Sequence, residues 1–154
     1  NLIVCRTFSK AWGLAALRVG YSISSPAIAD ILNRVRQPFN VDTVALSAAT
    51  AVLEDEDYLQ RSRDVNTAGL RQLQEAFDRM GLSYIPSAGN FVAVEVGEQA
   101  MGVYQSLLAH GVIVRPIGGY GMPRHLRVSV GLQEENERFI DALAQALAAS
   151  GLSD

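Results

Sequence analysis

The amine of Lys10 is the side chain in this sequence with the most distinctive chemistry. Of the 13 basic residues in the 154-residue chain, every one except Lys10 is an arginine. An amine can lose its proton and attack a carbonyl, whereas a guanidinium stays charged and is not a nucleophile. A sole lysine can also be an accident of composition at the surface, and the count alone does not separate these two interpretations. The neighbouring residues favour the chemical one.

The segment around Lys10 combines the amine with groups that bind phosphate. Ser9 and Lys10 follow a short apolar strand, and the ends of strands are where open α/β sheets place ligands. Partial burial there favours the uncharged, reactive amine. Arg18 carries a fork of donors that suits a phosphate, and the hydroxyls of Thr7 and Ser9 can add hydrogen bonds. Small residues that permit close approach of a bound group follow the lysine: Gly13, Ala15 and Ala16. The segment therefore predicts a site for a phosphorylated aldehyde cofactor.

Composition excludes several other classes of function. The net charge is −3, so the chain lacks the basic surface that binds nucleic acids non-specifically. No apolar run approaches the length of a membrane span, and no secretory leader is visible. Cys5 is the only cysteine, and His110 and His125 lie far apart, so neither an internal disulfide nor a metal site is expected. We therefore expect a cytoplasmic protein of the enzyme type.

The elements that position the Lys10 segment follow from the pattern of apolar residues. Residues 2–5 form a continuous apolar run, which is typical of a buried strand in a parallel sheet. Residues 6–19 predict a loop that leads into a second strand at residues 20–23. Helices are then predicted at residues 27–36, 43–53 and 55–80, the second of them mostly buried. Their start and stop signals are Pro26, Asp42 or Thr43, Asp55 and Gly81.

The second half of the chain predicts a sheet with helices packed on it. Strands are predicted at residues 83–85, 91–96, 112–115 and 126–130, and helices at residues 99–110 and 133–149. This order indicates an α+β layer. We therefore predict two domains, with residues 1–52 as the end of a larger parallel-sheet domain and residues 53–154 as a small C-terminal domain. A parallel strand at the first residues has no upstream neighbour here, so we expect the chain to be part of a longer protein.

Residues 7–21 carry a resemblance to a known family. Their sequence, Thr-Phe-Ser-Lys-Ala-Trp-Gly-Leu-Ala-Ala-Leu-Arg-Val-Gly-Tyr, closely resembles the cofactor-lysine motif of fold-type-I aminotransferases of the histidinol-phosphate aminotransferase group. Further segments of the chain are similar to that group in the same order: residues 36–41, 86–91, 111–116 and 126–131. The resemblance covers essentially the whole chain and is more specific for the fold-type-I class than for the exact substrate.

The resemblance implies a fold and a cofactor site. The fold would be α/β, the C-terminal part of a fold-type-I transferase that depends on pyridoxal 5'-phosphate. Lys10 would carry this cofactor covalently, and Arg18 would hold its phosphate together with Ser9 and Thr7. The acidic and aromatic residues that complete the site in the family lie upstream of the lysine, so we expect the chain alone to have little or no transaminase activity.

The resemblance also implies a substrate site and a partner. Arg127 would bind the carboxylate of an amino-acid substrate and, in this group, the phosphate of histidinol phosphate. Arg115 would assist with that phosphate, and Asn90 would lie near the substrate entrance. The reaction would transfer the amino group of histidinol phosphate to 2-oxoglutarate in histidine biosynthesis. Members of the family are homodimers, so a second copy of the chain is the expected partner.

Other interpretations remain open for the function and for single residues. The protein can be a threonine-phosphate decarboxylase or an aromatic aminotransferase of the same fold, or a truncated domain that packs or dimerises without cofactor. Arg127 and Arg115 can instead form structural salt bridges. We expect Cys5 to be inert in a buried strand and Trp12 to pack beneath the loop. Two further residues are expected to be exposed in a loop: Arg124 and His125.

Overall fold

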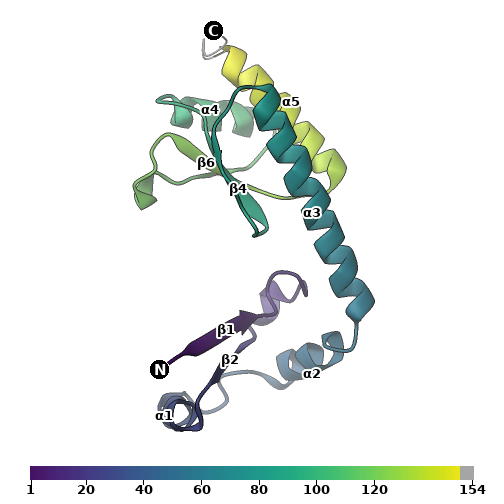
Figure 1. Cartoon of the computed structure of the whole chain (residues 1–154), viewed down its shortest axis with the longest axis vertical. Helices are drawn as coiled ribbons and strands as arrows, with labels where there is room; N and C mark the ends of the chain where they lie inside the picture. Colours follow the sequence, from purple (N-terminus) through teal and green to yellow (C-terminus); the bar gives the residue numbers. More distant parts are fainter. Residues whose placement is uncertain (150–154) are drawn as a thin grey trace. The chain divides into compact units, whose positions relative to one another are not determined.

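The structure of the chain is a computed structural model that describes residues 1–149 (Figure 1). It divides into two compact units, the first spanning Asn1–Arg63 and the second beginning at Asp64. The division falls within the long helix α3 (Glu56–Arg79). The domain boundary between residues 52 and 53, which concerns the larger protein, stays a prediction. No helix among the described residues is long and apolar enough to cross a membrane.

The first unit is built around a two-stranded hairpin. Strand β1 (Ile3–Thr7) pairs with β2 (Gly20–Ser24) in antiparallel register, with Thr7 opposite Gly20. The connection between these strands, residues 8–19, carries Lys10 and contains a short 3-10 turn, η1 (Ala15–Leu17). Two helices follow the hairpin, α1 (Pro26–Val35) and α2 (Thr43–Val52). Both helices were predicted within one residue of these bounds.

A small core holds this connection in place. Phe8 and Val19, which flank the loop, are buried with Ala45 and Ala49 of α2, and Trp12 packs against this cluster as expected. Helix α2 begins where the sequence predicts, because Asp42 Oδ1 accepts a hydrogen bond of 2.8 Å from the backbone N–H of Ala45. Both ends of the loop that carries Lys10 therefore pack against α2, a helix whose N-terminus is capped.

The predicted burial of the first strand and of the second helix is wrong for this chain. Strand β1 is mostly exposed, Cys5 is exposed, and its neighbour β2 is antiparallel rather than parallel. On α1 the apolar residues Ile31 and Val35 are exposed, and α2 buries only Ala45 and Ala49 among the described residues. The physical reason is that a two-stranded sheet has two faces, and the described residues cover them only around the Phe8 cluster.

The second unit contains a four-stranded antiparallel sheet in the order β3-β4-β6-β5. The strands are β3 (Tyr84–Ile85), β4 (Phe91–Glu95), β5 (Arg115–Pro116) and β6 (His125–Ser129). The other elements are α4 (Ala100–Ala109), the 3-10 turn η2 (Gly118–Tyr120) and α5 (Gln133–Ala149). The predicted strand at residues 112–115 is shorter than expected, because the N–H of Val112 caps α4 through the carbonyl of Leu107 instead of pairing in the sheet.

The two faces of this sheet differ in chemistry because side chains alternate along each strand. One face places Val92, Val94, Leu126 and Val128 in a core with residues of α3, α4 and α5. Helices α3 and α5 run beside each other in Figure 1, and the rings of Phe77 and Phe139 meet edge to face at 6.2 Å. The opposite face carries the side chains at alternate positions, including the two arginines of interest.

A buried amide ties the end of the sheet to α3. Asn136 is 2% exposed, and its Oδ1 accepts a hydrogen bond of 2.9 Å from the N–H of Gly131. Its Nδ2 donates to Gln72 Oε1 at 3.0 Å and to the carbonyl of Gly131 at 3.2 Å. The loop after β6 and helix α3 therefore approach closely, and Gly69 lies at the point of contact.

We expect Gly69→Ala to destabilise the protein and Gly102→Ala to stabilise it. A Cβ at Gly69 would clash with Val130 Cγ1 and lie 2.9 Å from Asn136 Nδ2, and such overpacking costs about 1–3 kcal/mol. A Cβ at Gly102 on α4 meets nothing within 4 Å, so the better helix propensity of alanine adds up to about 1 kcal/mol. Thermal unfolding of the two variants measures both signs, and an unchanged or raised midpoint for Gly69→Ala would contradict the packing described here.

Candidate active site

Lys10 lies at a tight turn in the loop between β1 and β2. The N–H of Gly13 donates to the carbonyl of Lys10 at 2.9 Å, and the N–H of Leu14 donates to the carbonyl of Phe8 at 2.9 Å. These bonds fix the backbone around the lysine, while its side chain is exposed. The expected partial burial of the amine is therefore not provided by residues 1–149. The amine also forms no ion pair with any residue that the structure describes.

The side chains of the loop that could donate hydrogen bonds to a phosphate lie together, as the sequence predicts. Arg18 Nη1 donates to the carbonyl of Ala15 at 2.7 Å and reaches Ser9 Oγ at 3.5 Å. The N–H of Ser9 donates to Thr7 Oγ1 at 3.0 Å. Three predicted residues, Thr7, Ser9 and Arg18, are thus connected by hydrogen bonds in the first unit.

The chemistry of this donor set fits an anionic group. Within residues 1–149, Arg18 has no carboxylate partner, so its charge is not neutralised by the chain itself. Arg18 also adopts a left-handed backbone with φ of 53°, a strained conformation for a residue other than glycine that recurs at functional sites. A guanidinium without a carboxylate partner among residues 1–149 and beside the Ser9 hydroxyl has the chemistry to bind a phosphate.

Gly13 lies against Tyr58, a neighbour that the sequence did not reveal. It has a φ of +70°, and a Cβ there would lie 2.8 Å from Tyr58 Oη. Tyr58, near the start of α3, therefore lies against the turn that holds Lys10. The expectation that Gly13 leaves room for a bound group is not tested, but the group that does approach it is the phenol of Tyr58.

Arg115 and Arg127 lie directly opposite each other on β5 and β6 in the second unit. Residues paired in this way have neighbouring Cβ atoms, and two like charges placed there repel each other. Both belong to the sheet face opposite the core, since Leu126 and Val128, which alternate with Arg127, point into the core. The pairing concentrates two positive charges at one edge of the sheet.

Arg127 is the more enclosed of the two arginines. Its Nε is buried and has no hydrogen-bond partner among the described residues. Its guanidinium carbon lies 5.0 Å from the centre of the Phe91 ring. Phe91 reaches it diagonally from β4, where it pairs with Ser129. A buried cationic donor that lacks a partner calls for an anionic ligand to satisfy it.

Neither arginine forms a salt bridge within residues 1–149. The nearby carboxylates pair instead with Arg124, whose Nε lies 3.0 Å from Glu95 Oε1 and 3.5 Å from Glu98 Oε1. Arg124 was expected to be an exposed loop residue, and its side chain is 50% exposed but engaged. The alternative of structural salt bridges for Arg115 and Arg127 therefore finds no support in this structure.

Two further predicted positions also lie in the second unit. The carbonyl of Asn90 accepts a hydrogen bond of 2.9 Å from the N–H of Val130, while its side-chain amide has no hydrogen-bond partner in the described chain. The loop before it is held by Asn66 Nδ2, which donates to the carbonyl of Gly89 at 3.0 Å. His125 was expected to be an exposed loop residue, but it begins β6 opposite Glu95 and its Nδ1 is buried.

The chain belongs to the aminotransferase class I and II family, whose model matches residues 1–143. Among its relatives, histidinol-phosphate aminotransferase 2 of Pseudomonas aeruginosa is 62% identical over 148 residues, which are 96% of this chain and 40% of that protein. The chain therefore spans about two fifths of the length of that relative.

Solved structures confirm the predicted fold class. The crystal structure of histidinol-phosphate aminotransferase from Sinorhizobium meliloti in complex with pyridoxal-5'-phosphate is 32% identical, with a TM-score of 0.89 over 97% of this chain and 42% of that chain. L-threonine-O-3-phosphate decarboxylase from Porphyromonas gingivalis, at 21% identity and a TM-score of 0.80 over 96% of this chain and 47% of that one, shares the fold. The fold alone does not separate the two activities.

Proposed function

We propose that the protein containing this chain is a pyridoxal-phosphate-dependent aminotransferase that acts on L-histidinol phosphate, with 2-oxoglutarate as the amino acceptor, in histidine biosynthesis. The observation that carries the substrate assignment is the cross-strand pair of Arg115 and Arg127, whose charges no carboxylate among residues 1–149 neutralises. Two arginines on one face of neighbouring strands match the charge and the oxygens of a phosphate monoester. The names of the relatives at 60–62% identity support the same substrate.

We propose that Lys10 is the catalytic residue. When bound, pyridoxal phosphate supplies an electron sink for the bond that breaks at the substrate α-carbon. Nζ of Lys10 would hold this cofactor, and the amine would act as a general acid–base that accepts the α-proton of the substrate and delivers it to the cofactor carbon. The amine of Lys10 is exposed and forms no ion pair with the described residues, which leaves it accessible to a carbonyl group.

We propose that Arg18, Ser9 and Thr7 hold the cofactor phosphate. Replacing Arg18 by glutamine is then expected to weaken cofactor binding by about 10–100-fold, the effect of losing a charge-assisted hydrogen bond. The dissociation constant for pyridoxal phosphate, measured by absorbance titration of the apoenzyme, tests this expectation. Arg34→Gln is the matched control, since Arg34 is exposed and lies 3.8 Å from Asp30. Equal affinity in the Arg18 variant and the control would refute the assignment of Arg18.

At the substrate end, Arg127 and Arg115 bind the anionic group and Asn90 lies near the substrate entrance. The energy of binding a phosphate remote from the reacting carbon orients that carbon for reaction. An amino donor that lacks the phosphate is therefore expected to react more slowly. The Nε of Arg127, which is buried and finds no hydrogen-bond partner in the described part of the chain, supports its place in this site.

The remaining proposals concern the larger protein. Because the chain spans 40% of its relatives, we propose that the rest of the subunit supplies the acidic and aromatic groups against the cofactor ring. The chain alone is then expected to have little or no activity. We also propose that the protein is a cytoplasmic homodimer, as the resemblance to the family implies.

The experiment that tests the function uses the cofactor-loaded whole protein. L-histidinol phosphate is expected to remove the absorbance band of the enzyme-bound cofactor and to yield a ketone product, and 2-oxoglutarate is expected to restore the band. Threonine phosphate and tyrosine serve as alternative substrates. Release of carbon dioxide from threonine phosphate would establish the decarboxylase instead, and faster reaction with tyrosine would establish an aromatic aminotransferase.

A further inference from the structure

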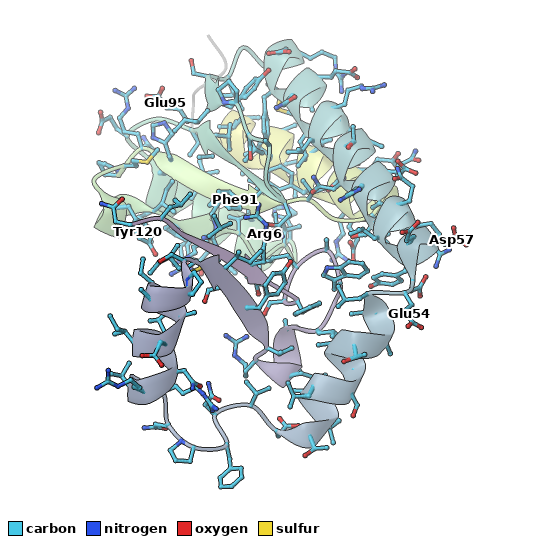
Figure 2. All side chains as sticks on the ribbon, turned by 60° about the horizontal axis from the view of Figure 1, so that its bottom comes forward. Arg6, Glu54, Asp57, Phe91, Glu95 and Tyr120 are labelled. Atoms are coloured by element: carbon cyan, nitrogen blue, oxygen red, sulfur yellow. The ribbon has the colours of Figure 1, made fainter. Side chains whose placement is uncertain are left out.

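We infer that Tyr120 positions Arg115 and so determines the preference of the enzyme for a phosphorylated amino donor. This inference rests on the proposed function, in which Arg115 contacts the substrate phosphate. Tyr120 itself is a positioning residue, because it acts through Arg115. It lies in the turn η2 between β5 and β6 (Figure 2).

The turn that carries Tyr120 is fixed at both ends. Ile117 is 6% exposed, and its N–H donates to the carbonyl of His125 at 3.4 Å. The N–H of Tyr120 donates to the carbonyl of Ile117 at 3.0 Å, and Gly121 closes the turn with φ of 79°. The backbone of Tyr120 is therefore held relative to the end of β5, where Arg115 lies.

Tyr120 contacts Arg115 in two ways. Arg115 Nη2 donates to Tyr120 Oη at 3.3 Å, and the guanidinium carbon lies 5.9 Å from the centre of the Tyr120 ring. An exposed arginine otherwise samples many rotamers, and ordering it on binding costs free energy. A ring and a hydroxyl at these distances reduce that cost before the substrate arrives.

Arg115 contacts a phenol and not a carboxylate, and this difference matters for phosphate binding. A carboxylate in place of Tyr120 would orient Arg115 but would also neutralise it, and it would repel a phosphate. A phenol orients the guanidinium and leaves its charge available. Phe91 has the same relation to Arg127, at 5.0 Å from ring centre to guanidinium carbon. Each arginine of the pair thus rests against an aromatic ring, while the carboxylates of Glu95 and Glu98 are engaged by Arg124.

The test compares two amino donors that differ only in the phosphate, L-histidinol phosphate and L-histidinol. In the cofactor-loaded whole protein, Tyr120→Ala is expected to raise KM for histidinol phosphate about 3–10-fold, and Tyr120→Phe, which keeps the ring, about 2–3-fold. The value of kcat for histidinol phosphate and the kcat/KM for histidinol should stay unchanged. Gly119→Ala is the matched control, since Gly119 lies in the same turn and a Cβ there meets nothing within 4 Å.

Two results would overturn the inference while the proposed function stands. Unchanged KM for histidinol phosphate in both Tyr120 variants would show that Arg115 needs no positioning by Tyr120. An equal loss with both donors, or a loss in Gly119→Ala of the same size, would show that the turn has only a structural role. Tyr120→Phe keeps the test valid if Tyr120→Ala fails to fold. If the unmodified enzyme does not act on histidinol phosphate, the proposed function fails first, and the inference fails with it.

Discussion

Replacing Lys10 by alanine is expected to abolish transamination, with a loss in kcat of at least about 10³-fold, because the residue that holds the cofactor and transfers the α-proton is removed. Lys10→Arg is expected to be equally inactive. Arginine keeps the positive charge, but its guanidinium neither attacks a carbonyl nor releases a proton near neutral pH. The pair of variants thus separates a need for the amine from a need for charge. Steady-state rates with histidinol phosphate measure the effect.

Chemical trapping provides a measurement that does not depend on turnover. Reduction of the cofactor-loaded protein with borohydride should leave the cofactor on the peptide that contains Lys10, which is identifiable because no other lysine occurs among these 154 residues. The Lys10→Ala and Lys10→Arg variants should show no such labelled peptide. A cofactor trapped on an upstream lysine in the unmodified protein, or normal rates in Lys10→Arg, would contradict the central role of Lys10.

Replacing Arg127 by glutamine is expected to raise KM for histidinol phosphate about 10–100-fold, which corresponds to the loss of a charge-assisted hydrogen bond in a partly buried site. The Nε of Arg127 is buried and has no hydrogen-bond partner within residues 1–149, so the ligand is expected to supply that partner. Arg127→Lys is expected to recover only part of the affinity, because a point charge lacks the fork that matches a phosphate.

Arg124→Gln is the matched control for this prediction. Arg124 lies close by in sequence and also carries a positive charge, but it pairs with Glu95 at 3.0 Å and Glu98 at 3.5 Å. Its loss should leave KM for histidinol phosphate within about twofold, as expected for a surface ion pair. If Arg124→Gln impaired binding as strongly as Arg127→Gln, general electrostatic attraction would explain the effect, and a specific contact from Arg127 would not.

The sequence by itself determined the helices, the composition of the Lys10 loop and the family. Asp42 and Asp55 were recognisable as helix starts because a side-chain cap is a local interaction, and both accept the expected backbone hydrogen bonds. The association of Ser9 with Arg18 was also predictable, since both lie within one short loop between paired strands. Local spacing is sufficient for features of this kind.

Only the tertiary structure decided which residues meet across the chain. The alternation of Leu126, Arg127 and Val128 indicates which face each side chain occupies, but it does not give the partner strand or the register. The opposition of Arg115 and Arg127 follows from the pairing of β5 with β6.

The contact of Tyr120 with Arg115 and that of Tyr58 with Gly13 likewise depend on the tertiary fold. Burial was mispredicted for Cys5 because a continuous apolar run indicates a capacity for packing, whereas exposure depends on what the rest of the structure places over it. Long-range pairing and packing are not encoded in local periodicity, and this is why the residues that hold the two arginines became visible only in the fold.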